Sequence, residues 1–99
     1  MKIQTQAIQF KADGKLIDRI HDKLGKMERL FDRIINANVH MKLENSGQVR
    51  DKIMEVQLHV PGNTLVASAT DKTFESALDS VTSSLKKQLI RYKDRLRNS

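Results

Sequence analysis

The sequence has no cysteine, which excludes a disulfide framework, a thiolate metal site and a cysteine nucleophile. It has no tryptophan, one tyrosine and three phenylalanines, so it offers few rings on which single-stranded bases can stack. No apolar run approaches the roughly 18 residues needed to cross a bilayer. The first residues also lack the apolar stretch of a secretory signal. These absences favour a cytoplasmic protein with no membrane partner.

Positive charge is present in excess, and it is concentrated at the end of the chain. The whole sequence carries 18 lysines and arginines against 12 acidic residues, a net charge of +6. Residues 86–99 hold six of these cations and one anion, Asp94, so this stretch is +5 and the remainder is +1. A block of one sign favours a polyanionic partner. From charge alone, a solvated helix face or a frayed tail remains an alternative.

Hydrophobic periodicity divides the chain into two helices and four strands. Residues 2–7 predict a short strand. Asp13 is a suitable N-cap for a helix that reaches about Ile34. Gly25 lies within this helix and lowers its intrinsic helix propensity, so packing must support that turn. Alternation then predicts three strands, separated by turn signals at residues 45–48 and 61–63. Thr73 is a suitable N-cap for a last helix of about 23 residues. Its apolar stripe comprises Phe74, Leu78, Val81, Leu85, Leu89, Tyr92 and Leu96.

The order strand, helix, three strands, helix predicts an α+β fold. Two amphipathic helices are expected on one face of a four-stranded sheet, with the last three strands in an antiparallel meander. We therefore expect residues 1–99 to form one domain, a two-layer β-α-β-β-β-α sandwich.

The cations of the last helix form two rows, one beside its apolar stripe and one on the outward side of the helix. We call Lys86, Lys93 and Arg97 the first row, and Lys87, Arg91 and Arg95 the second row. In the first helix, one flank carries Arg19, Lys23, Lys26 and Arg33. If the two helices lie side by side, these rows can border a common groove suited to a phosphate backbone. Alternatively, Lys23 and Lys26 simply pair with nearby carboxylates such as Asp18, Asp22 or Glu28.

The sequence favours binding of the RNA backbone over base reading or catalysis. Three of the four aromatic residues fall on apolar faces, and Tyr92 is expected at the core edge with its hydroxyl in solvent. His40 and His59 lie on the polar faces of neighbouring strands and could sit opposite each other, but a third metal ligand is lacking. His21 lies near Asp22 without an evident nucleophile. We expect no enzyme, no metal and no cofactor.

Several short blocks, in this order and spacing, resemble one known family. They are KLGKME at 23–28, FDRI at 31–34, LHV at 58–60, ASA at 67–69, ALD at 77–79, LKKQL at 85–89 and KDRL at 93–96. With them the chain resembles the short-form ribosome hibernation-promoting factors, also called ribosome-associated inhibitors. The resemblance runs over essentially the whole sequence.

The resemblance implies a β-α-β-β-β-α protein that binds the small ribosomal subunit and its ribosomal RNA in stationary or starved cells. It implies occupancy of the channel for messenger and transfer RNA, inhibition of translation and ribosome hibernation. The family's RNA-facing basic residues match Lys23, Lys26, Lys87, Arg91, Lys93, Arg95 and Arg97. Lys86 is added to this RNA-binding set, although the family is less regularly basic there.

Two departures from the family pattern qualify this expectation. Many relatives read Asp-Met-Tyr where this chain has Thr73, Phe74 and Glu75, so a surface tyrosine is lost. The chain also stops before the C-terminal dimerisation domain of the long-form relatives. We therefore expect a monomer off the ribosome, which would pair ribosomes only with a separate ribosome-modulating protein or by an indirect change in ribosome shape.

Two other classes of function compete with this expectation. The alternative function is a general double-stranded RNA-binding module that acts off the ribosome. A protein of anionic membrane surfaces is a third class, but the core needs the apolar stripe of the last helix.

Overall fold

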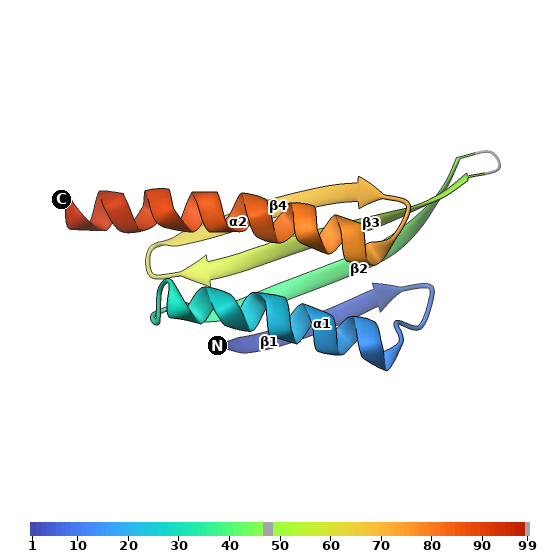
Figure 1. Cartoon of the computed structure of the whole chain (residues 1–99), viewed down its shortest axis with the longest axis horizontal. Coiled ribbons are helices and arrows are strands. Elements are labelled where there is room, and N and C mark those ends of the chain that lie inside the picture. The colour runs from blue at the N-terminus through green and yellow to red at the C-terminus, as the bar shows by residue number, and fades with distance from the viewer. Residues whose placement is uncertain (47–48, 99) are drawn as a thin grey trace.

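Four strands form one sheet, and two long helices cover one of its faces (Figure 1). The computed structural model describes residues 1–46 and 49–98. The elements follow the order β1 (Lys2–Ile8), α1 (Gly14–Gly25), η1 (Lys26–Arg29), β2 (Asn36–Ser46), β3 (Val49–Val60), β4 (Asn63–Asp71) and α2 (Phe74–Arg97). The expected α+β, β-α-β-β-β-α order is therefore confirmed.

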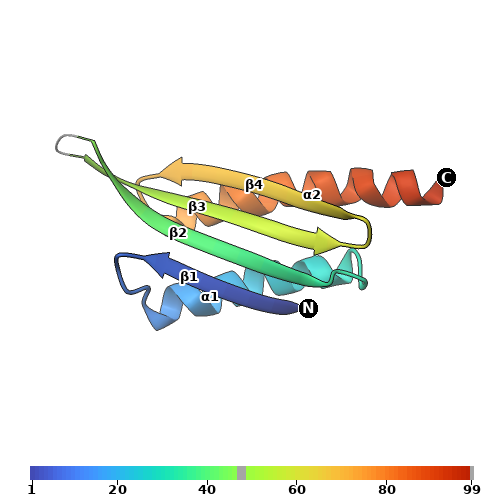
Figure 2. The ribbon, with the colours of Figure 1, turned by 180° about the vertical axis from the view of Figure 1, so that it is seen from behind.

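The strands lie in the sheet in the order of the chain, β1-β2-β3-β4 (Figure 2). β1 pairs with β2 in parallel, because α1 and η1 carry the chain back along the sheet between them. The pairs β2–β3 and β3–β4 are antiparallel, which confirms the meander. Only Pro61 and Gly62 separate the paired residues Val60 and Asn63, and Gly62 has a φ of +77°.

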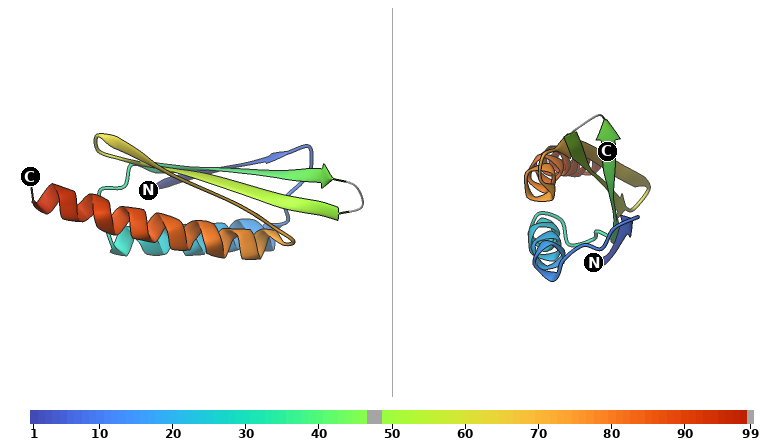
Figure 3. Two further views of the ribbon diagram at one scale, coloured as in Figure 1. Left: turned by 90° about the horizontal axis from the view of Figure 1, so that it is seen from above. Right: turned by 90° about the vertical axis from the view of Figure 1, so that its right-hand side faces the viewer.

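The core lies between the sheet and the two helices, which run side by side on the same face (Figure 3). Val39, Met41, Met54, Val56 and Leu58 project from the central strands and are almost completely buried. They pack against buried side chains of the two helices, which are Ile20 and Leu24 of α1 and Leu78, Leu85 and Leu89 of α2. This packing commits the apolar stripe of each helix to the core and leaves the opposite flanks in solvent.

Both predicted N-caps are present. The carboxylate of Asp13 accepts a hydrogen bond from the amide of Leu16 at 2.8 Å, and the hydroxyl of Thr73 accepts one from the amide of Ser76 at 3.1 Å. Each bond satisfies an amide that has no partner within its own helix. The starts of both helices are thus fixed by local sequence.

The predicted length of the first helix is wrong. The α-helix ends at Gly25 and is followed by the 3₁₀ turn η1, so regular helix does not reach Ile34. Met27, Phe31 and Ile34 are nevertheless buried, as the periodicity required. A tighter turn and a loop place these side chains in the core as well as a helix would, and the weak helix propensity of Gly25 favours the change.

Two predicted details at the end of α2 are also wrong. Leu96 was expected in the apolar stripe, but its side chain is 41% exposed because the last turn of α2 passes the edge of the core. The hydroxyl of Tyr92 was expected in solvent, but it donates a hydrogen bond of 2.5 Å to the carbonyl of Pro61.

The turn expected at residues 45–48 is only partly described. Asn45 and Ser46 belong to β2 and so extend that strand, whereas residues 47 and 48 lie outside the described residues.

Candidate nucleic-acid interface

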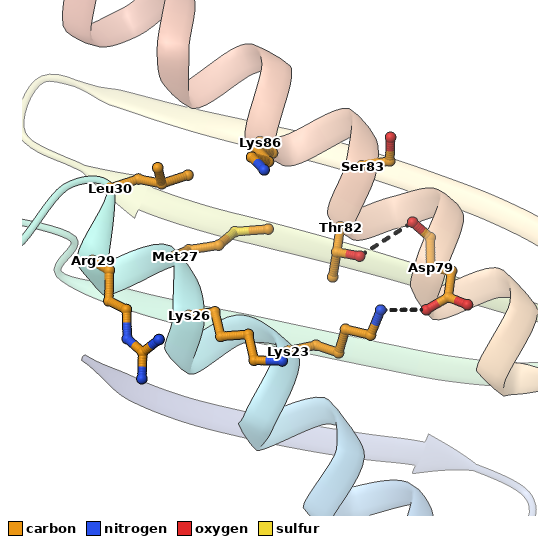
Figure 4. A pocket seen from close by; sticks show the side chains of 9 residues that line it. All are labelled: Lys23, Lys26, Met27, Arg29, Leu30, Asp79, Thr82, Ser83 and Lys86. Atoms are coloured by element: carbon orange, nitrogen blue, oxygen red, sulfur yellow. Dashed lines mark hydrogen bonds and ion pairs between the residues drawn. The ribbon is translucent and has the colours of Figure 1, made fainter.

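A hollow of about 560 Å³ lies between η1, the end of α1 and the middle of α2 (Figure 4). We call it the inter-helix groove. Its floor is formed by Met27, Leu30 and Thr82, and its rim carries cations from both helices. Its lining residues are Lys23, Lys26, Met27, Arg29, Leu30, Asp79, Thr82, Ser83 and Lys86. Three residues of the predicted RNA-binding set, Lys23, Lys26 and Lys86, therefore meet at one site.

Lys23 forms an ion pair across this groove. Its ammonium lies 2.7 Å from the carboxylate of Asp79 on α2, and both side chains are partly exposed. The hydrogen bond from Lys23 lowers the pKa of the Asp79 carboxyl below its usual value, and the charges of Lys23 and Arg19 act in the same direction. The pair fixes the Lys23 side chain between the two helices.

Lys26 pairs with a carboxylate close to it in the sequence, as the alternative interpretation of the sequence expected. Its ammonium lies 3.5 Å from the carboxylate of Asp22, one turn earlier in the chain. The side chains are 60% and 68% exposed, so water and salt screen this pair. Such a pair leaves the ammonium available to a phosphate.

The first row continues beyond the inter-helix groove. Lys93 and Arg97 line a second hollow, together with Arg29 and Arg33 from η1 and the loop that follows it. The guanidinium of Arg33 lies over the ring of Phe31, 5.1 Å from its centroid. Cations from opposite sides thus line the space beside α2 from Lys86 to its last turn.

The second row lies on the other flank of α2, so the expectation of one common groove is wrong for it. Lys87, Arg91 and Arg95 line a separate hollow with Leu65 of β4, Ser84 and Gln88. The side-chain amide of Gln88 donates a hydrogen bond of 2.9 Å to the carbonyl of Val66, which ties this flank to the edge of the sheet. The helical spacing of 87, 91 and 95 turns these residues away from α1.

The six cations of the two rows are without ion pairs in the described part of the chain, although Asp32 lines the hollow of Lys93 and Arg97 and Asp94 lies on α2. Lys93 is half-buried and the other five are exposed. Holding six like charges within twelve residues costs repulsion, which a bound polyanion would relieve.

The three histidines do not belong to any group that could hold a metal ion in the described residues. His40 lies opposite Glu55, and His59 lies opposite Asn36, so the expected facing pair is wrong. Instead, His59 hydrogen-bonds to Asn38 and Thr64 on the outer face of the sheet. Across the described part of the chain, no group of three or more histidines and carboxylates is placed to hold a metal ion. None of the described helices is both long and apolar enough to cross a membrane.

Sequence reasoning missed two residues of the inter-helix groove. Arg29 was overlooked because the first helix was expected to continue, whereas the 3₁₀ turn brings this residue to both hollows beside α2. Asp79 was overlooked because its partner, Lys23, lies 56 positions away and no local pattern links them.

The comparisons with known proteins agree on one family. Residues 3–97 match the model of the family described as sigma 54 modulation protein / S30EA ribosomal protein. The ribosome hibernation promoting factor of Azotobacter vinelandii is 33% identical over 95 residues, which cover 96% of this chain and 85% of that protein. The factor of the same name from Escherichia coli K12 is 35% identical over 75 residues, covering 76% of this chain and 75% of that protein.

Solved structures share the fold. A ribosomal subunit interface protein from Coxiella burnetii superposes with a TM-score of 0.83 at 23% identity, covering 95% of this chain and 99% of that one. The N-terminal domain of Protein Y from Thermus thermophilus gives a TM-score of 0.81 at 22% identity, covering 93% and 99% of the two chains. These likenesses establish the architecture of the sheet and the two helices.

Proposed function

The chain belongs to the sigma 54 modulation protein / S30EA ribosomal protein family, and we propose that it binds the small ribosomal subunit and inhibits translation as a hibernation factor. Its relatives are named ribosome hibernation promoting factors and a ribosomal subunit interface protein. The proposal treats residues 1–99 as one ribosome-binding domain that acts as a monomer in the cytoplasm.

One observation carries the proposal: the cations of α2 have no ion-pair partner in the described residues. Ribosomal RNA supplies a dense array of phosphates to such a surface, and each contact releases counterions. The proposed RNA-binding residues are Lys23 and Lys26 of α1 and η1, the first row, and the second row. Arg29 joins them because it lines both hollows beside α2.

The mechanism that we propose is occupancy, without catalysis or a cofactor. The protein would lie in the channel of the small subunit where messenger RNA and the anticodon ends of transfer RNA bind. Backbone contacts from lysine and arginine position a protein on nucleic acid without reading bases, which suits a fixed ribosomal site. Pairing of inactive ribosomes would need a separate ribosome-modulating protein or an indirect change in ribosome shape.

Cell-free translation tests this function. Added protein should inhibit synthesis in proportion to its occupancy of small subunits, and Lys87→Glu/Arg91→Glu/Arg95→Glu should abolish inhibition without unfolding the domain. The matched control is Lys2→Glu/Lys11→Glu/Lys42→Glu, which makes the same change in net charge at exposed positions outside α2. Equal inhibition by the wild type and the α2 variant would refute the assigned surface.

The alternative function is a double-stranded RNA-binding module that acts off the ribosome. A competition measurement separates the two. An unrelated RNA duplex should displace the protein from small subunits only at a large molar excess if the ribosome is the target. Equal affinity for the duplex and the subunit would favour the alternative.

A further inference from the structure

Between residues 86 and 97, the solvent-facing side of α2 carries one anion, Asp94, and one large apolar side chain, Ile90, between its two rows of cations. Ser76, Ser83 and Ile90 recur every seven residues on this side, and we call them the outer crest. All three side chains are exposed, and that of Ile90 is 45% exposed. A large apolar side chain therefore stands in water at the centre of the most basic part of the molecule.

The two rows face different neighbours. The first row borders the inter-helix groove and the hollow beside η1, where Lys86, Lys93 and Arg97 line the walls. The second row borders the β4 side of the helix. At about 100° per residue, the mean directions of the two rows lie about 140° apart around the helix axis, with Ile90 between them.

This separation is too wide for one phosphate backbone. A helix with its side chains is about 10–12 Å across, so cations on its opposite flanks reach phosphates on opposite sides. Each row extends over two turns or more, from Lys86 to Arg97 in the first and from Lys87 to Arg95 in the second. Each can therefore follow a backbone segment along α2.

We propose that α2 lies lengthwise between two RNA backbone segments about one helix diameter apart, with Ile90 facing the floor between them. The inference rests on the proposed function, because it describes how the same surface would meet ribosomal RNA. A regular A-form duplex suits this arrangement poorly, since its major groove is too narrow for a helix and its wide minor groove is too shallow to place phosphates along both flanks of α2. The target is therefore two segments of folded RNA that approach each other in a junction.

Ile90 has a defined role in this arrangement. Its apolar side chain contacts sugars and base faces at the floor of the gap, while the rows hold the phosphates on both sides. This contact removes apolar surface from water and involves no counterion, so it adds affinity that does not depend on salt. The phosphate contacts of the two rows do depend on salt.

The test measures the dissociation constant for purified small subunits over a series of salt concentrations. Three variants are compared with the wild type: Lys86→Gln/Lys93→Gln/Arg97→Gln, Lys87→Gln/Arg91→Gln/Arg95→Gln, and Ile90→Ala. Controls are Lys2→Gln/Lys11→Gln/Lys42→Gln for charge and Ile35→Ala for apolar exposure, since Ile35 is 56% exposed away from α2. Circular dichroism checks that each variant is folded.

Each triple variant of α2 should lower the slope of log affinity against log salt by about 2 to 3 units, and by similar amounts. Ile90→Ala should weaken binding about 3- to 10-fold at every salt concentration and leave the slope unchanged. A photo-reactive amino acid at position 90 should crosslink to ribosomal RNA.

Three results would overturn the inference while leaving the proposed function in place. These are a slope that responds to only one row, an Ile90→Ala affinity equal to that of the wild type, and a crosslink from position 90 to a ribosomal protein. Failure of the wild-type protein to bind small subunits at any salt concentration would instead refute the proposed function, and the inference with it.

Discussion

The ammonium of Lys23 and the carboxylate of Asp79 lie 2.7 Å apart and join α1 to α2 across the inter-helix groove. Figure 4 shows Lys23 reaching from α1 toward the Asp79 side chain. The pair therefore holds a proposed RNA-binding cation in place, and it also presents an anion to any phosphate that approaches. Because Asp79 both holds Lys23 and repels phosphate, a substitution of Asp79 tests the proposed surface.

Asp79→Asn should strengthen binding to small subunits by about 2- to 5-fold at low salt, with the gain shrinking as salt rises. The substitution removes an anion from the groove and frees Lys23 for phosphate. The measurement is the dissociation constant of each protein for small subunits at a low and a high salt concentration. Glu44→Gln, an equal charge change at an exposed position of β2, is the control. Weaker binding by Asp79→Asn would mean that the pair orients Lys23 for RNA.

The same pair predicts a dependence of stability on pH. Because Lys23 lowers the pKa of Asp79 in the folded state, the pair stabilises the protein at neutral pH, above the unfolded pKa. This contribution is lost as the pH falls below 3.8 and through the folded pKa. The denaturation midpoints of the wild type and Asp79→Asn should therefore differ at pH 7 and converge in acid. A constant difference across this range would contradict the assignment.

Two glycines should respond in opposite ways to alanine. Gly25 has a φ of −58°, and an added Cβ would meet no atom within 4 Å, so Gly25→Ala should stabilise the protein by about 0.4–1 kcal/mol. Gly62 has a φ of +77° in the turn between β3 and β4, so Gly62→Ala should destabilise it by about 1–2 kcal/mol. Chemical denaturation measures the free energy of unfolding of both variants against the wild type. Destabilisation by Gly25→Ala would mean that the α1–η1 junction needs a glycine.

Tyr92→Phe should lower the free energy of unfolding by about 1 kcal/mol. The change removes the hydrogen bond from the Tyr92 hydroxyl to the Pro61 carbonyl, which ties α2 to the β3–β4 turn. It keeps the ring that meets Phe31 edge to face at 5.4 Å. Denaturant titration of the two proteins tests this. Unchanged stability would indicate that water replaces the hydroxyl without loss.

The features that the sequence predicted correctly are local ones. Asp13 and Thr73 cap their helices through bonds to residues three positions away, and alternation identified the inward side chains of each strand. The end of the first helix was misplaced because the spacing of Met27, Phe31 and Ile34 suits a 3₁₀ turn and loop as well as a helix.

The features that were missed depend on contacts between distant segments. His40 faces Glu55 because the β2–β3 register is set by where the two strands turn, which spacing within one strand does not define. The Lys23–Asp79 and Tyr92–Pro61 contacts each join elements far apart in the chain. The second row was separated from the inter-helix groove only when the side of α2 that faces α1 was known.

Sedimentation of purified small ribosomal subunits with the added protein tests the central claim most directly. The protein should travel with the subunits in low salt and leave them steeply between about 50 and 200 mM salt, as expected for a surface that contacts several phosphates. The control Lys2→Gln/Lys11→Gln/Lys42→Gln should sediment like the wild type. Recovery of the wild-type protein only at the top of the gradient in low salt would contradict the account.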